Sequence, residues 1–222
     1  MEPIAHIHTD FTSKFGVPRQ AGLVRELRAT IVFAPEYRNP EALRGLDGFS
    51  HLWLIWEFSQ CVGKPWSPTV RPPRLGGNAR MGVFATRSPF RPNPIGLSCV
   101  ELVGVEEHTP QGPVIFVAGA DLMDGTPIYD IKPYVPYADC HPEAVGGFAQ
   151  DAPEQKLKVD IPSHLLCLIP EGKREALAGV LAQDPRPPYQ RDSQRVYGFG
   201  FGGLEVQFTV DNGVARIVDI HG

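Results

Sequence analysis

Prolines and glycines interrupt this chain so often that they argue against long helices. There are 23 of each among 222 residues, and both residue types weaken or break a helix interior. The apolar runs between them are short, for example residues 4–7, 30–33, 51–58, 97–105 and 113–118. Short runs bounded by turn residues are typical of β-strands. We therefore expect the first half of the chain to form a β-barrel or sandwich whose loops carry the function.

The sequence changes character near residue 140. Residues 141–154 are small and punctuated by proline, which is consistent with a linker. A short strand is expected at 157–161, followed by a helix at 173–183, where apolar residues recur at the helical spacing. We expect a mainly β protein with two domains, a small β-barrel over residues 1–140 and a smaller α+β domain over residues 141–222.

The last part of the chain contains a strong hairpin signal. Apolar residues alternate at 204–210 and again at 214–218, on either side of Asp211-Asn212-Gly213. An Asn-Gly pair between two alternating segments favours a two-residue hairpin turn. The glycine-rich segment 198–203 is not followed by a convincing helix. We interpret it as a turn rather than as a nucleotide-binding loop.

Composition excludes several classes of protein. Hydrophobic residues make up 42% and charged residues 21% of the chain, as in an ordinary globular protein. No apolar run approaches the roughly 18 residues of a membrane span, and residues 1–11 lack the features of a secretion signal. The four cysteines contain no Cys-x-x-Cys pair, so buried or inert thiols are expected. His6 and His8 alternate on a strand without a third ligand in sight. We expect a cytoplasmic protein without a membrane partner or a metal.

Positive charge is concentrated in one segment of an otherwise acidic chain. Residues 61–100 contain no Asp or Glu and six Lys or Arg residues. Because the whole chain sums to −4, the remaining residues carry a net charge of −10. A basic segment in an acidic protein indicates local binding of a polyanion such as a nucleic acid. The alternative is a solvated loop whose arginines serve solubility.

The densest part of the basic segment is residues 71–98, with five arginines, five prolines and four glycines. Proline stiffens a loop, and glycine lets the backbone approach a ligand closely. Guanidinium groups on a rigid loop suit phosphate and carboxylate groups, which they bind in bidentate fashion. This pattern therefore favours a binding function over a structural one.

Five segments in the same order resemble the motifs of the TrmO/TsaA family. The most specific is Gly-Val-Phe-Ala-Thr-Arg-Ser-Pro-Phe-Arg-Pro-Asn-Pro-Ile-Gly-Leu-Ser at 82–98. The others are 15–24, 48–53, 121–134 and 181–189. The resemblance runs from about residue 3 to residue 197 and is weakest between 140 and 180. Five motifs in order are a much more specific signal than any single pattern.

The resemblance implies a β-barrel methyltransferase that is unrelated to the Rossmann-type enzymes and acts as a homodimer. It implies transfer of a methyl group from S-adenosylmethionine to N6 of threonylcarbamoyladenosine at position 37 of threonine tRNA. Many relatives have histidine where this chain has Ser59, which removes that imidazole from the site. Matched residue by residue, the cofactor contacts fall on Pro18, Arg19, Gln20, Ser59, Gln60, Arg87, Leu97, Asp121, Leu122, Met123 and Asp124.

The chemistry of the cofactor suggests roles for these residues. Asp121 and Asp124 suit the ammonium or the ribose, Arg87 or Arg19 suits the carboxylate, and Leu97 with Leu122 suits the adenine. Methyl transfer is an in-line displacement, so the main task of the protein is alignment. We expect the arginine stretch and the aspartate-rich turn to converge, with Arg87 close to Asp121.

The attacking nitrogen is ureido-like and a weak nucleophile, so a base or a polarising contact would help it. Asp130 and Tyr134 are the candidate catalytic residues, although Asp130 is as well explained as the cap of a turn. The C-terminal domain is expected to contact the anticodon stem-loop of tRNA. The candidate RNA-binding residues are Arg71, Arg74, Arg80, Arg91, Arg186 and Tyr189.

Two other function classes stay open at this point. A non-catalytic RNA- or nucleotide-binding barrel would keep the scaffold without the reaction. A hydrolase that uses histidine and cysteine is disfavoured because no nucleophile–base motif is present. Binding of S-adenosylmethionine distinguishes the methyltransferase from both.

Overall fold

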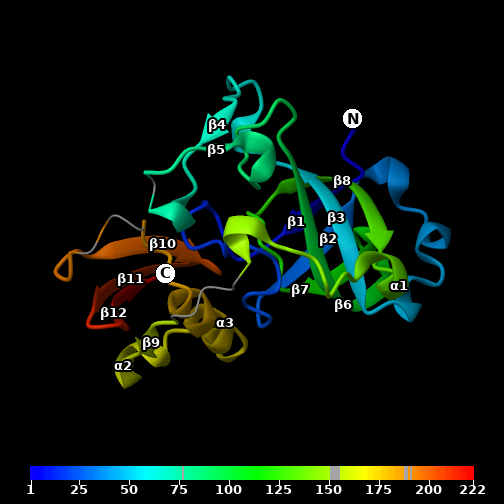
Figure 1. Cartoon of the computed structure of the whole chain (residues 1–222). Helices are drawn as coiled ribbons and strands as arrows, with labels where there is room; N and C mark the ends of the chain where they lie inside the picture. Colours follow the sequence, from blue (N-terminus) through cyan, green and yellow to red (C-terminus); the bar gives the residue numbers. More distant parts are fainter. Residues whose placement is uncertain (77, 151–155, 188–189, 191) are drawn as a thin grey trace.

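Six antiparallel strands close into a barrel in the order β1-β2-β7-β6-β3-β8 (Figure 1). The computed structural model describes residues 1–76, 78–150, 156–187, 190 and 192–222. The expectation of a mainly β fold with an N-terminal barrel is confirmed. The barrel strands are β1 (Ala5–His8), β2 (Arg28–Phe33), β3 (His51–Glu57), β6 (Ile95–Thr109), β7 (Gly112–Ala118) and β8 (Thr126–Pro133).

Alternation along the strands fills the barrel with apolar side chains. On β3, Leu52, Leu54 and Trp56 are buried inside, and the residues between them face outward. Ser98 on β6 pairs in register with Leu54 and also points inward, as the one buried polar residue of that strand. A buried hydroxyl needs a hydrogen-bond partner. This requirement makes Ser98 important for the site described below.

A second sheet, with the order β10-β11-β12-β9, forms the C-terminal part (Figure 1). Helix α3 supplies Ala176, Leu177, Val180 and Leu181 to the core that it shares with this sheet. The helix and the hairpin expected from the sequence are both confirmed. The elements are β9 (Lys158–Asp160), α2 (Ser163–Leu166), α3 (Glu171–Ala182), β10 (Tyr197–Phe201), β11 (Leu204–Asp211) and β12 (Val214–His221).

The interpretation of residues 198–203 as a turn is wrong for most of the segment. Residues 197–201 form strand β10, and only Gly202-Gly203 makes the turn into β11. The aromatic residues Tyr197, Phe199 and Phe201 alternate with glycine and are buried in the C-terminal core. Glycine at the intervening positions conceals this alternation in the sequence. A Cβ at Gly200 would lie 2.6 Å from Oγ1 of Thr12, so the glycine makes room for an N-terminal segment.

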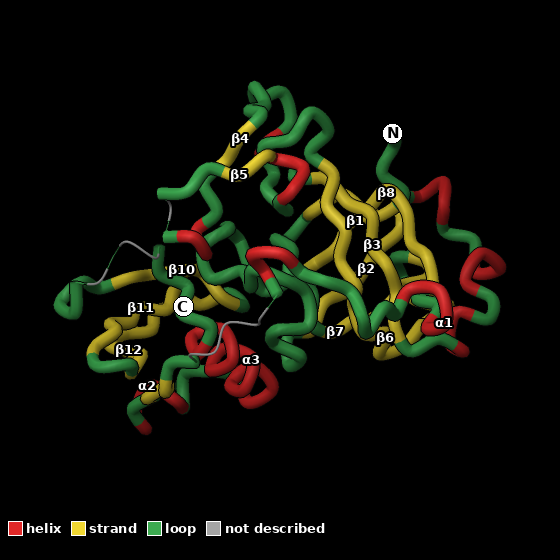
Figure 2. Tube along the Cα trace, in the orientation of Figure 1, coloured by secondary structure: helices red, strands yellow, loops and turns green. Residues whose placement is uncertain are grey.

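Residues 61–94 of the basic segment project from the barrel as an arm of loops (Figure 2), and residues 95–100 begin strand β6. The only strand pairing within the arm, among the described residues, is between β4 (Thr69–Val70) and β5 (Met81–Gly82). Beyond the barrel, the short helix α1 (Pro136–Asp139) begins the connection to the C-terminal part. No helix in the described ranges is long and apolar enough to cross a membrane.

All four cysteines are free thiols. Cys61 and Cys99 are half-buried, but Cys140 and Cys167 are exposed. Of the expected alternatives, buried or inert thiols, burial does not apply to the last two, and their inertness stays a prediction. They directly follow the short helices α1 and α2, where the chain lies at the surface.

Candidate functional site

The centre of the candidate site is a short hydrogen-bonded chain at the wall of the barrel. The indole N–H of Trp56 donates to Oγ of Ser98 at 2.9 Å. Ser98 in turn donates from Oγ to Oδ1 of Asp121 at 2.6 Å. A hydrogen bond to a charged acceptor is shorter and stronger than one between neutral groups. Trp56 and Ser98 therefore fix the Asp121 carboxylate in one place.

Burial raises the pKa of the Asp121 carboxyl above its usual value. Smaller effects act in the opposite direction: the hydrogen bond from Ser98, backbone N–H groups of Asp121 itself and of Ala21, and the positive charge of Arg87. A largely buried carboxylate that still faces a cationic loop is typical of a ligand-binding position. A cation bound beside Asp121 would therefore stabilise its charged form.

Arg87 lies near Asp121 and anchors the N-terminal connection to the arginine loop. Its Nη1 donates to Oε1 of Gln20, and its charge acts on the Asp121 carboxyl. This charge effect agrees with the expected convergence of the arginine stretch with the aspartate turn, which stays a prediction for the bound state. Gln20, Arg87 and Asp121 come from three segments far apart in sequence. The guanidinium is exposed, so it retains donors for a ligand carboxylate.

Arg91 supports the loop that carries Arg87. Its Nη1 donates to the carbonyl oxygens of Thr86 at 2.7 Å and Val83 at 3.2 Å. The guanidinium carbon also lies 5.7 Å from the ring centroid of Phe84, a cation–π contact. These contacts close the turn that directly precedes Arg87. Arg91 was expected to bind RNA, and the structure shows its guanidinium bound to its own loop.

Asp124 ends the aspartate turn and pairs with the first strand. Its Oδ1 lies 3.2 Å from Nδ1 of His8 and accepts a hydrogen bond from the Thr9 backbone N–H at 3.1 Å. Leu122 is 1% exposed in the barrel core, whereas Leu97 is 56% exposed on the outer face of β6. The two leucine side chains lie on opposite sides of the barrel wall. The expectation that they form one adenine slot within the chain is therefore wrong.

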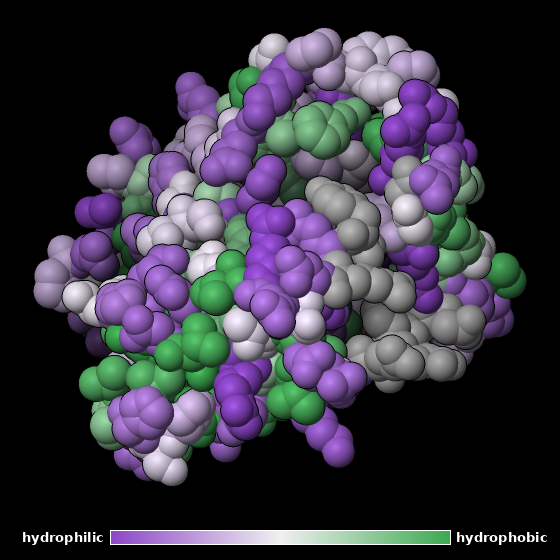
Figure 3. Space-filling model, turned by 90° about the vertical axis from the view of Figure 1, so that its left-hand side faces the viewer, coloured by the Kyte–Doolittle hydropathy of each residue, from purple (hydrophilic) through white to green (hydrophobic). Residues whose placement is uncertain are grey.

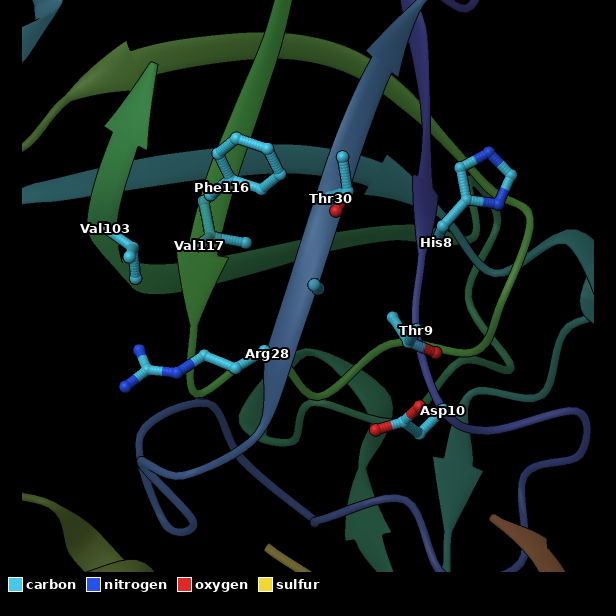
Figure 4. A pocket seen from close by; sticks show the side chains of 9 residues that line it. His8, Thr9, Asp10, Arg28, Thr30, Val103, Phe116 and Val117 are labelled. Carbon is cyan, nitrogen blue, oxygen red and sulfur yellow. The ribbon is translucent and has the colours of Figure 1, made fainter. Parts of the chain in front are cut away.

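Beside the aspartate turn, a groove of about 410 Å³ lies on the outer face of the barrel (Figure 4). Its floor is formed by Thr30 and Phe116 on the neighbouring strands β2 and β7, with Val103 beside them. His8 and Arg28 lie at its rim. The groove was not expected from the sequence, because its members alternate with core residues on separate strands.

The candidate catalytic residues lie on and directly after β8. Asp130 pairs with Lys132 at 3.0 Å and accepts a hydrogen bond from the Ile131 backbone N–H at 2.9 Å. Asp130 therefore lies within a strand and does not cap a turn. The Tyr134 ring packs against Trp53, with 5.8 Å between ring centroids. Burial, followed by the nearby Cys140 thiol, raises the pKa of the Tyr134 phenol, so it is protonated near neutral pH.

The remaining cofactor candidates lie on two connections. Pro18 is buried and Arg19 is exposed in the connection between β1 and β2, next to Gln20. Met123 is half-buried in the aspartate turn. Ser59 and Gln60 are exposed in the 3-10 turn that follows β3.

The candidate RNA-binding arginines divide into two groups. Arg71, Arg74 and Arg80 are exposed on the arm, where Arg80 also donates to Oγ1 of Thr69 at 2.9 Å. Arg186 is different, because its side chain is only 14% exposed and forms a two-pronged pair with Asp184 at 2.8 and 2.9 Å. Tyr189 lies outside the described residues.

The side of the molecule that faces the viewer in Figure 3 shows hydrophilic groups interspersed with smaller apolar patches.

No group of three or more His, Cys, Asp or Glu side chains in the described part of the chain is placed to hold a metal ion. Sequence reasoning also missed Ser98, although it belongs to the motif at 82–98. The available signal was its position between Gly96 and Val100 on an inward-facing row of β6. A polar residue on such a row needs a partner, and here the partner is Asp121.

Fold and site together define a β-barrel protein whose candidate site sets a half-buried carboxylate beside an arginine loop. The model of the tRNA-methyltransferase O N-terminal domain matches residues 6–140, and the model of the TrmO C-terminal domain matches residues 155–222. The chain belongs to the TrmO family.

Individual relatives match over nearly the whole chain. A tRNA (adenine(37)-N6)-methyltransferase of Escherichia coli K12 is 46% identical over 217 residues, covering 94% of this chain and 92% of the relative. A putative S-adenosylmethionine-dependent methyltransferase, RcsF, of Pseudomonas aeruginosa is 41% identical, covering 100% and 97%. A crystal structure of TrmO from Pseudomonas aeruginosa superposes with a TM-score of 0.80 at 35% identity, covering 100% and 97%.

Proposed function

We propose that this protein is an S-adenosylmethionine-dependent methyltransferase that acts on N6 of the adenosine at position 37 of tRNA. The observation that carries the proposal is the match to a relative of that name at 46% identity over 94% of the chain. The finer part of the proposal is that the substrate adenosine carries a threonylcarbamoyl group and belongs to threonine tRNA. That part rests on the motif resemblance at residues 82–98 and 121–134.

The charged groups of the site fit the methyl donor. S-adenosylmethionine supplies an activated methyl group on a sulfonium and carries a carboxylate, an ammonium and an adenosine. Arg87 offers a guanidinium to the carboxylate, and Gln20 holds that guanidinium in place. Asp121 offers a negative charge to the ammonium, and Ser98 orients it. Because the raised pKa of Asp121 reflects burial, a cationic ligand that neutralises the carboxylate relieves this cost.

For the transfer step, we propose that Tyr134 donates a hydrogen bond to the carbonyl of the modified adenosine. A tyrosine phenol is already protonated near neutral pH at its usual pKa of about 10, and the surroundings of Tyr134 raise its pKa further, which suits a donor better than a base. Asp130, held by Lys132, is the group proposed to accept the proton that leaves N6.

For tRNA recognition, we propose that the arm binds the backbone of the anticodon stem-loop. Arg71 and Arg80 are exposed there in a segment that contains no acidic residue, which suits phosphate contacts. The C-terminal domain, residues 141–222, is proposed as the second contact surface. Arg186 would contribute only after exchanging Asp184 for a phosphate, because the two side chains are paired.

We also propose a cytoplasmic homodimer. The support for the homodimer is a pair of apolar residues on the outer face of the barrel, where exposed Leu97 on β6 lies in register with Ile55 on β3. If the outer faces of two copies meet there, Leu97 of each copy would be covered by the other. Light scattering of the wild type and of Leu97→Lys tests this part separately: a dimer that becomes a monomer supports it, and a monomeric wild type refutes it.

Titration calorimetry with S-adenosylmethionine, and competition by S-adenosylhomocysteine, test the central proposal. Mass spectrometry of tRNA from cells that lack the gene then tests the reaction, with the wild type and Arg87→Ala restored in parallel. The methylated adenosine should disappear without the gene and return only with the wild type. Absence of cofactor binding would favour a non-catalytic RNA-binding barrel instead.

A further inference from the structure

The connection between β1 and β2 holds the aspartate turn through three hydrogen bonds. Thr9 donates from Oγ1 to the carbonyl oxygen of Leu122 at 3.1 Å, and its backbone N–H donates to Oδ1 of Asp124 at 3.1 Å. The Asp124 backbone N–H returns a hydrogen bond to the carbonyl oxygen of Phe11 at 2.8 Å. The turn that carries Asp121 is therefore placed by residues 9–11.

The same three residues are attached to the C-terminal part of the chain. The carbonyl oxygen of Asp10 accepts a hydrogen bond from the Gly202 backbone N–H at 2.8 Å. The Asp10 carboxylate forms an ion pair with Lys173 on α3. The Phe11 ring meets Phe201 on β10 edge-on, with 5.5 Å between ring centroids. Figure 1 shows this blue N-terminal connection beside the orange strand β10.

The attachment continues toward the part of the connection that holds Arg87. Phe15 packs against Tyr197 and Phe199 on β10, at 6.5 and 6.2 Å between ring centroids. Gly16 is buried with a φ of +94°, and a Cβ there would lie 2.6 Å from Cδ2 of Phe199. Such close approach requires glycine. Four residues later the chain reaches Gln20, the hydrogen-bond partner of Arg87.

The proposed methyl-donor site has two parts, the turn that carries Asp121 and the Gln20–Arg87 pair. Both parts are linked to the C-terminal sheet by the connection between β1 and β2. Phe11, Val24 and Leu27 belong to the C-terminal hydrophobic core and not to the barrel core. The Lys173–Asp10 pair is partly buried, at 33% and 18% side-chain exposure. Water screens such a pair less than a fully exposed one. Loss of the Lys173 charge is therefore expected to loosen the connection between β1 and β2.

We propose that the C-terminal domain positions the methyl-donor site in addition to contacting RNA, and that Lys173 is a positioning residue for that site. This inference rests on the proposed function. Lys173 touches neither Gln20 nor Asp121 and acts through Asp10 and the connection. An RNA that shifts the C-terminal sheet would change cofactor affinity through the same residues, and the cofactor would change RNA affinity by the same factor.

The test compares Lys173→Met with a matched control, Arg216→Met. Arg216 forms an ion pair with Asp160 on the same C-terminal sheet but outside the connection, at 2.7 Å. Hydrogen exchange of residues 9–24 and the affinity for S-adenosylhomocysteine are measured on all proteins. Lys173→Met should speed exchange in residues 9–24 and weaken the affinity about fivefold or more, and the control should change neither. The charge reversal Asp10→Lys with Lys173→Asp should recover both.

Wild-type exchange and wild-type affinity in Lys173→Met would overturn the proposal. Equal losses in Lys173→Met and Arg216→Met would overturn it as well, because the effect would then be general destabilisation. A wild type that binds no S-adenosylhomocysteine would refute the proposed function instead. In that case the exchange rates alone decide whether the C-terminal domain holds the connection.

Discussion

Arg87 and Asp121 are 34 positions apart in the sequence, yet the arginine charge lowers the pKa of the half-buried Asp121 carboxyl against the larger effect of burial. Gln20 holds the arginine from one side, and Ser98 holds the aspartate from the other. Each charge keeps its own neutral partner, so a ligand can contact both charges while the hydrogen bonds to Gln20 and Ser98 persist. A zwitterionic ligand matches this pair, because it brings one carboxylate and one ammonium.

Arg87→Ala should weaken the binding of S-adenosylmethionine by about tenfold or more, because a hydrogen bond to a charged group contributes about 1.5–3 kcal/mol. Arg87 is exposed, so the thermal unfolding midpoint should stay within error of the wild type. Calorimetry measures the affinity. Arg44→Ala removes an exposed arginine that pairs with Glu41 outside the site and serves as the control. Equal affinities in all three proteins would show that the carboxylate is held elsewhere.

Asp121→Asn should make the protein more stable than the wild type at mildly alkaline pH while reducing cofactor affinity. Burial raises the pKa of this carboxyl in the folded state. Its contribution to stability is therefore complete below the usual carboxyl pKa of about 4 and is lost as the pH rises through the folded-state value. Asparagine is neutral throughout and carries no such loss.

Urea unfolding of Asp121→Asn and of the wild type, at about pH 5 and about pH 8, measures this difference. The advantage of the variant should grow with pH. A variant that is less stable than the wild type at the higher pH would mean that Arg87 and Ser98 outweigh burial of the carboxylate.

The sequence predicts well those elements whose side chains alternate visibly. The strands at 30–33 and 51–58, the helix at 173–183 and the final hairpin are all present. Strand β10 was missed because glycine occupies the positions where polar residues usually mark the outer face of a strand. Once aromatic burial is known, the pattern at 197–201 is clear.

The sequence identified the segments that form the site, but not the directions in which their side chains point. The motifs identified Arg87 and Asp121, and in the structure the charge of Arg87 acts on the Asp121 carboxyl. They did not indicate that Leu97 and Leu122 face opposite sides of the barrel wall. Nor did they indicate that Arg186 is paired with Asp184, which adopts a left-handed backbone conformation with a φ of 51°. The side of the barrel wall that a side chain faces, and the partner with which it pairs, depend on the barrel register and on single backbone dihedrals. A sequence motif does not specify either of them.

Gly96→Ala should destabilise the protein by about 1–3 kcal/mol, as overpacking of a core does. A Cβ at this position would lie 2.2 Å from Cε2 of Trp56, so the indole must move away from Ser98. Cofactor affinity should fall as well, because Ser98 then loses the donor that fixes it beside Asp121. Urea unfolding and calorimetry measure the two effects.

Gly104→Ala is the matched control for Gly96→Ala. Gly104 lies on the same strand, and a Cβ there would meet nothing within 4 Å. It should stay close to the wild type in stability and in affinity. If both alanine variants lost the same stability, the cause would be strand glycine in general and not the contact with Trp56.

Arg71→Ala and Arg91→Ala should separate RNA binding from support of the donor site. Arg71 is exposed on the arm, so its loss should weaken tRNA binding and reduce the slope of log affinity against log salt by about 0.7–0.9. The guanidinium of Arg91 is bound to the carbonyl oxygens of Val83 and Thr86. Its loss should leave that slope nearly unchanged and should weaken cofactor binding, because the turn before Arg87 is no longer closed.

Filter binding over a range of salt concentrations and calorimetry with S-adenosylhomocysteine measure the two properties on both variants. The two variants are expected to differ in opposite ways: Arg71→Ala should reduce the salt slope, and Arg91→Ala should reduce cofactor affinity. If Arg91→Ala reduced the salt slope as much as Arg71→Ala and left cofactor affinity intact, Arg91 would exchange its loop carbonyls for phosphate in the complex. The arginine loop would then be primarily an RNA-binding element, and the position of Arg87 would depend on Gln20 alone.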